Sequence, residues 1–199
     1  MTYILCWESN PDSDFSFTRR RNMKFRIIFI ILMILFLSAV EFGTAQEQAS
    51  AVDDVFMNPE SLVRGLYTAV SFEPGHLLDF DYVSKFFVPE VIFGVRRTRT
   101  SMAILDLEGF FDWWREDFEK HKMKERGFEE TIEKIKVTVY GNIAHCFVVY
   151  KARLKTPADT PGQLGLDSHS LMKKDGRWWV VSIMNDIITP QNPLPEELR

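Results

Sequence analysis

The chain has 199 residues, a formal net charge of -4, and a composition that is 46% hydrophobic and 14% aromatic. This length and apolar content are typical of one globular domain with a full hydrophobic core and some additional segments. Because the chain is acidic, with a pI of about 5.6, we expect no basic surface for phosphate backbones and therefore no nucleic-acid partner.

The N-terminal region has the pattern of an export signal. A basic cluster at 19–26 precedes fourteen residues without a charge, Ile27–Val40. Small residues at Gly43 and Ala45 then favour cleavage after Ala45. We therefore expect export to the periplasm or the exterior, and the alternative is a membrane anchor formed by residues 27–40. Met23 is an alternative start, because it opens a typical signal sequence.

The chain divides into four parts by composition. Residues 1–45 form the N-terminal extension and signal, and residues 46–57 form a polar leader. A single domain is expected at 58–190, followed by a proline-rich tail at 191–199. All the candidate functional residues fall within the third part.

Three segments have the spacing of helices. The first opens with Asn58 as a cap and Pro59 in its first turn, and Glu73-Pro74-Gly75 ends it. A second, short helix is expected at 79–87. The third spans about 104–124, with large apolar side chains recurring along one face.

Strands are expected between and after these helices. Residues 90–95 read as a short strand, and after Gly127 the apolar period changes from that of a helix to that of a strand. Four strands are predicted there, with turns at Gly141-Asn142 and Asp175-Gly176. Their expected ranges are 131–141, 143–154, 165–174 and 177–188. This order predicts an α+β fold in which three N-terminal helices pack on a curved, mainly antiparallel β-sheet.

Two stretches of the sequence are distinctive: "GNIAH" at 141–145, and "DGRWWVVSIMND" at 175–186, which is followed by a "P-x-N-P-x-P" tail at Pro190–Pro195. They resemble the nuclear transport factor 2-like superfamily, and within it the SnoaL-like proteins. The resemblance covers about residues 58–190. It implies a cone-shaped, cystatin-like fold, in which the helices and the curved sheet enclose one deep pocket.

The resemblance leaves three functions open. Members of the superfamily include ketosteroid isomerase, SnoaL-type cyclases and scytalone dehydratase, and other members are not enzymes. Our first hypothesis is an exported protein that binds a small apolar molecule in the pocket. The alternatives are an isomerase, cyclase or dehydratase that uses acid–base catalysis, and a non-enzymatic dimerisation module.

The pair His145-Cys146 is not expected to form a reactive thiol site. Adjacent residues of a strand point to opposite faces, so these two side chains cannot act together. Cys146 is instead predicted to be a small buried apolar residue. The histidines of the mature chain do not have the spacing of a helical zinc motif, and we expect no metal and no cofactor. These histidines are His76, His121, His145 and His169.

Acid–base catalysis would need an Asp, His or Tyr inside an apolar pocket, where burial moves its pKa toward neutrality. The catalytic candidates are Asp186, His145 and His169. The candidates for ligand binding are Tyr150, Trp179, Asn185 and Asp186. Asp186 follows a very apolar stretch, so we expect it at the pocket mouth, in an ion pair, or at a strand end that faces water.

The last strand carries apolar residues on both of its predicted faces. Strict alternation places Trp178, Val180, Ser182, Met184 and Asp186 on one face. It places Trp179, Val181, Ile183, Asn185 and Ile187 on the other. One face would line the pocket, and the other would need a cover. We therefore expect a homodimer that forms through the sheet.

Overall fold

The computed structural model describes residues 54–98 and 100–199 of the chain. The predicted signal, its cleavage site, the alternative anchor and the choice between Met1 and Met23 lie outside these residues. Within the described ranges, no helix is both long and apolar enough to cross a bilayer.

The described residues form helices and one sheet in a fixed order along the chain. The elements are α2 (Pro59–Ala69), α3 (Phe80–Ser84), β1 (Phe87–Arg96), β2 (Met102–Leu105), α4 (Leu107–His121), α5 (Met123–Arg126), β3 (Phe128–Tyr140), β4 (Ile143–Leu154), β5 (Gln163–Lys174), β6 (Arg177–Ile187) and the 3-10 helix η1 (Glu196–Leu198). The four long strands were all expected from the sequence, within a few residues at each end.

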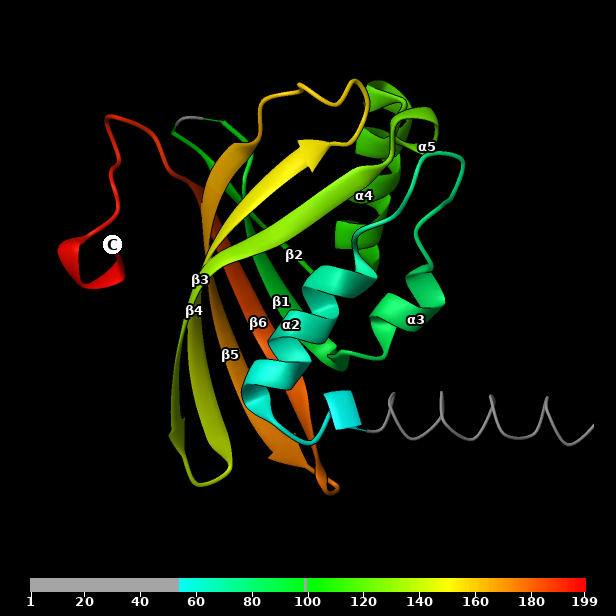
Figure 1. Cartoon of the computed structure of the whole chain (residues 1–199). Helices are drawn as coiled ribbons and strands as arrows, with labels where there is room; N and C mark the ends of the chain where they lie inside the picture. Colours follow the sequence, from blue (N-terminus) through cyan, green and yellow to red (C-terminus); the bar gives the residue numbers. More distant parts are fainter. Residues whose placement is uncertain (1–53, 99) are drawn as a thin grey trace, which may run out of the picture. The chain divides into compact units, whose positions relative to one another are not determined.

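The sheet has six strands in the order β2-β1-β6-β5-β4-β3. All neighbours are antiparallel except β1 and β6, which are parallel. The sheet is curved, and α2, α3 and α4 all lie on its inner side (Figure 1). The α+β class and the curved, mainly antiparallel sheet are therefore confirmed.

The N-terminus of α2 follows the predicted capping pattern. The Asn58 side chain accepts hydrogen bonds from the backbone N–H groups of Glu60 at 2.8 Å and Ser61 at 3.3 Å. Pro59 occupies the first turn, where its missing N–H has no intrahelical role. Leu62, Val63 and Leu66 turn inward and are almost fully buried. The cap therefore fixes where the helix begins, and the apolar face fixes how it packs.

The three N-terminal helices are not confirmed as expected: one strand, at 90–95, was predicted between the second and third helices, whereas two strands, β1 and β2, separate α3 from α4. The third helix was expected from residue 104, but Asp106 caps it by accepting a hydrogen bond from Gly109 N–H at 2.9 Å. Residues Met102–Leu105 instead pair with β1 as an edge strand. A segment of four residues is too short to show a strand period in the sequence, so this strand could not be predicted.

The alternation predicted for the last strand is wrong past Val180. Between β5 and β6, Leu171 pairs with Val180 but Ser170 pairs with Ser182, so Val181 is the extra residue of a bulge. A bulge shifts the strand by one residue and reverses every face after it. Trp178 and Val180 therefore share the inner face with residues 183, 185 and 187, and not with residues 182, 184 and 186.

Candidate functional site

The inner face of the sheet and the helices enclose a cavity of about 120 Å³. Its apolar wall comes mainly from α2, α3, β1 and α4. Its polar residues are Tyr67 of α2, Glu130 of β3, Tyr150 of β4, Asp167 and His169 of β5, and Asn185 of β6. The cavity is therefore apolar and aromatic over most of its lining and has a polar group of residues contributed largely by the sheet.

Stacked and tilted rings build the aromatic wall. Phe93 of β1 and Phe110 of α4 stack with ring centroids 4.0 Å apart and planes 2° from parallel. Trp113 and Trp114 each lie with their centroids 5.8 Å from that of Phe110. Interlocked rings of this kind form a stiff surface with little side-chain freedom.

Asp167 is the centre of the polar group. Its Oδ2 accepts a hydrogen bond from the Tyr67 hydroxyl at 2.6 Å, and its Oδ1 accepts one from Asn185 Nδ2 at 2.7 Å. Asn185 lies directly opposite Asp167 in the register of β5 and β6, and its Nδ2 also donates to the Tyr150 hydroxyl at 2.6 Å. One buried carboxyl thus connects residues from α2, β4 and β6.

Burial raises the pKa of Asp167 to about 6, although the hydrogen bonds from Asn185 and Tyr67 favour its charged form. Burial, followed by the nearby charge of Asp167, raises the pKa of Glu130 to about 8. Among the described residues, no group donates a hydrogen bond to the Glu130 carboxyl or forms an ion pair with it. Near neutral pH the cavity therefore holds one carboxyl that is mostly ionised and one that is mostly protonated.

His169 is fully buried beside this group. Burial lowers its pKa to about 3, and repulsion by His145 contributes less. Its Nε2 lies 3.8 Å from Asp167 Oδ2 and 3.4 Å from the Tyr67 hydroxyl. Because the ring is neutral at ordinary pH, the contact with Asp167 is not an ion pair. Its Nδ1 has no hydrogen-bond partner among the described residues.

The structure brings three of the predicted site residues together and leaves the other three outside the cavity. Tyr150, Asn185 and His169 line it. His145 lies on the outer face of β4, with Nε2 2.9 Å from the Ser168 hydroxyl. The Trp179 indole donates to the Lys174 carbonyl at 3.2 Å, and the Arg177 guanidinium covers its ring at 3.8 Å.

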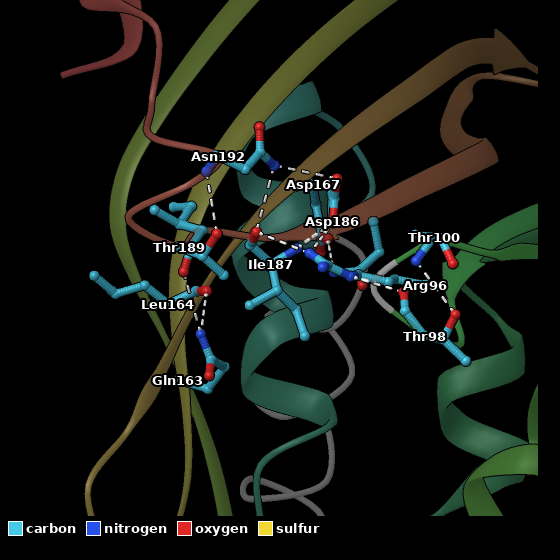
Figure 2. Close-up of polar contacts among 12 residues, drawn as sticks. Arg96, Thr98, Thr100, Gln163, Leu164, Asp167, Asp186, Ile187, Thr189 and Asn192 are labelled. Atoms are coloured by element: carbon cyan, nitrogen blue, oxygen red, sulfur yellow. Dashed lines mark hydrogen bonds and ion pairs between the residues drawn. The ribbon is translucent and has the colours of Figure 1, made fainter.

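Asp186 does not line the cavity but forms an ion pair at the end of β6 (Figure 2). Arg96 Nη1 donates to its Oδ1 at 2.7 Å, and Asn192 Nδ2 donates to its Oδ2 at 3.3 Å. The Asp186 side chain is 48% exposed, whereas Arg96 is only 14% exposed. Two of the placements expected from the sequence therefore apply together: Asp186 is ion-paired, and it lies at a strand end, where it faces water and contacts the tail.

Asp167, Glu130 and Tyr67 are cavity residues that the sequence analysis missed. In "GLDSHS" the alternation puts Asp167 on the same face as His169, and a carboxyl next to a buried histidine was a usable signal. Glu130 gave no such signal, because it stands among other charged residues. Cys146 is fully buried, as predicted, and burial raises the pKa of its thiol to about 11.

No family model matches this chain, and no curated protein matches it. Solved structures do resemble it. A protein assigned as a calcium/calmodulin-dependent protein kinase type II association domain, from Thiobacillus denitrificans, is 13% identical over 67% of this chain and 98% of its own, with a TM-score of 0.53. A nuclear transport factor 2-like protein with a cystatin-like fold, from Novosphingobium aromaticivorans, is 11% identical over 77% of this chain and 93% of its own, also with a TM-score of 0.53. The described domain therefore has the nuclear transport factor 2-like, cystatin-like fold.

Proposed function

We propose that this domain binds a small, mainly apolar molecule, about the size of one ring, that carries a polar group. The observation that carries the proposal is the cavity of about 120 Å³ inside the cone. An engineered cavity of roughly 150 Å³ binds benzene, whereas sites for drug-sized ligands begin at roughly 300 Å³.

The distribution of side chains supports a ligand with two different ends. Phe110 and Trp114 offer flat apolar surface to a ring or a short hydrocarbon, and Asp167 and Asn185 offer hydrogen-bonding groups to a polar substituent. A cone filled completely by its own side chains would have favoured a module that only mediates association. A cavity that remains open, with an apolar part and a hydrogen-bonding part in its lining, favours ligand binding.

Acid–base catalysis in the same cavity is the second candidate, and the carboxyl pair favours it. Asp167, with a pKa of about 6, is the proton acceptor, and Glu130, with a pKa of about 8, is the proton donor. Isomerisation, cyclisation and dehydration each need a proton removed at one atom and returned at another. Such positioned groups contribute about a hundredfold to ten-thousandfold in rate.

Export and assembly are further parts of the proposal. Export rests on the sequence pattern of residues 19–45 alone. A homodimer through the outer face of the sheet is supported by exposed apolar side chains there, such as Met184 at 42% and Ile143 at 61% exposure. The similarity to a kinase association domain also favours an assembly.

The binding proposal is tested by calorimetric titration of benzyl alcohol into the protein. Wild type should bind it with millimolar affinity or better, and Ile183→Phe should abolish binding because Ile183 lines the cavity. The matched control is Ile143→Phe, the same change at an exposed site on the sheet. The absence of binding to wild type, or equal binding by Ile183→Phe, would contradict the proposal.

A further inference from the structure

The described lining of the cavity has carboxyl groups that can carry negative charge, and its histidine, His169, is neutral at ordinary pH. Glu130 and Asp167 both line it, and no lysine or arginine of the described ranges does. The Glu130 carboxyl has no hydrogen-bond donor or cation beside it among the described residues. A carboxyl in an apolar cavity is stabilised most by an opposite charge within about 4 to 6 Å, which nothing described in the protein supplies.

The hydrogen bonds around Asp167 leave acceptors in excess. Asn185 already directs its Nδ2 at Tyr150 and Asp167, and the Tyr67 hydroxyl donates to Asp167. If His169 Nε2–H donates to the Tyr67 oxygen, as their 3.4 Å contact allows, then the unpartnered Nδ1 is an acceptor. The Tyr150 hydroxyl keeps a hydrogen to donate, and the Asp167 oxygens, with two lone pairs each, can accept further hydrogen bonds from a ligand.

The aromatic wall is suited to the same kind of ligand. The faces of Trp and Phe rings attract organic cations, most strongly where water is excluded. Trp113 already takes one cation, because the Arg97 guanidinium lies 5.5 Å from its ring centroid. Arg97 itself does not line the cavity, so its charge does not neutralise the carboxyls there.

From these three observations we infer that the cavity selects small organic ammonium ions, with an amine of about one ring in size held between the aromatic wall and the Glu130 and Asp167 carboxyls. This inference rests on the ligand-binding function proposed above and names its ligand class. The ammonium group supplies a positive charge and up to three N–H donors, which is what the polar end lacks. Carboxylate ligands are excluded, because they would add negative charge beside Asp167.

Three ligands of matched shape test this selectivity. Benzylamine is a cation at neutral pH, benzyl alcohol is its neutral counterpart, and benzoate is an anion. In calorimetric titrations of the wild-type protein, benzylamine should bind at least about tenfold more tightly than benzyl alcohol, and benzoate should not bind. Benzylamine that binds no more tightly than benzyl alcohol would overturn the inference.

Two neighbouring glutamates provide the variant and its control. Glu130→Gln should reduce benzylamine affinity about tenfold and leave benzyl alcohol affinity unchanged, because the bound cation favours the ionised form of Glu130 and a glutamine cannot ionise. Glu129→Gln removes a carboxylate that pairs with Arg153 at 2.7 Å, outside the cavity lining, and should change neither ligand. Equal losses for both ligands in Glu130→Gln would overturn the inference, because they indicate a structural role.

The ligand series separates this inference from the function on which it rests. If benzyl alcohol binds in the cavity and benzylamine gains nothing, the binding function stands and the cation preference is wrong. If none of the three ligands binds, both are wrong. If benzylamine binds about tenfold better and loses this advantage in Glu130→Gln alone, both stand.

Discussion

Asp167 and Glu130 have raised pKa values because burial removes their carboxyls from water, and none of the residues that the structure describes places a cation beside them. Asp167 is compensated in part by two hydrogen bonds, from Tyr67 and Asn185. The Glu130 carboxyl receives no hydrogen bond from a described residue, and its pKa is raised further. Groups held at such a cost to stability are typical of functional sites, where a ligand or a substrate uses them.

The pH dependence of stability should report Glu130. Its pKa is raised in the folded state, so it contributes stability below its unfolded pKa and loses it as pH rises through about 8. Between about pH 6.5 and 8.5, where Asp167 is already ionised and His169 already neutral, the free energy of unfolding should fall by about 1–2 kcal/mol. Thermal melting of Glu130→Gln should show a flatter profile there, and Glu129→Gln should keep the wild-type slope. If stability fell with pH as steeply in Glu130→Gln as in wild type, the pH dependence in this range would come from another group.

Cys146 and Asp186 should affect stability and not ligand binding. Cys146→Ala leaves a small cavity in the core and should cost about 1–2 kcal/mol. Asp186→Asn breaks a half-exposed ion pair with Arg96 and should cost less than about 1 kcal/mol. Melting curves and benzyl alcohol titrations measure both effects. Loss of binding in either variant at unchanged stability would mean that the polar site extends beyond the cavity.

At the scale of elements, the helix caps and the bulge decide which residues reach the cavity. The bulge at Val181 turns Ile183 and Asn185 inward, so that Asn185 meets Asp167. Asp106 delays the start of α4 until Leu107, which allows residues 102–105 to pair as β2. The bulge thus reverses the side-chain faces of β6 beyond Val181, and the cap sets the residue at which α4 begins.

The first helix offers a direct test of a cap. Asn58→Ala removes the acceptor for the N–H groups of Glu60 and Ser61 and should lower stability by about 1 kcal/mol, measured by urea unfolding. Asn58→Asp keeps the acceptor and should lose little. A loss in Asn58→Asp as large as that in Asn58→Ala would mean that the cap bond does not hold the helix end.

The sequence predicts well what depends on local pattern. The cap at Asn58, the four long strands and the burial of Cys146 all follow from spacing and residue type. The sequence could not predict β2, because four residues are too few to show a strand period. It could not predict the bulge at Val181, because the pattern of apolar residues gives no sign of an extra residue in the strand. The bulge also decides that Asn185 and not Asp186 lines the cavity, and Asp167 and Glu130 reach it through long-range packing that the sequence pattern does not contain.

At the scale of the whole molecule, the outer face of the sheet is where association is expected. Met184 and Ile143 leave apolar surface there. The C-terminal tail returns toward the same sheet, since Lys134 of β3 donates to the Arg199 carbonyl and Leu198 is buried. A partner subunit would therefore have to fit beside this tail.

A lysine on the outer face should disrupt the proposed homodimer. Met184→Lys places an unpaired charge in the apolar part of that face, and should give monomers or aggregates in sedimentation velocity at micromolar concentration. Ile143→Gln is a milder polar change at an exposed position and should retain more of the dimer. Wild-type protein that sediments as a uniform monomer would contradict the assembly.

The central claim is that a small ligand occupies the space between the α4 rings and the Asp167 group. Nuclear Overhauser contacts between bound benzyl alcohol and assigned side chains test it most directly. We predict contacts from the ligand ring to Phe110 and Trp114, and from its CH₂ group to the side-chain amide of Asn185. Contacts only to outer-face residues such as Met184 or His145, or none at saturating ligand, would contradict the account.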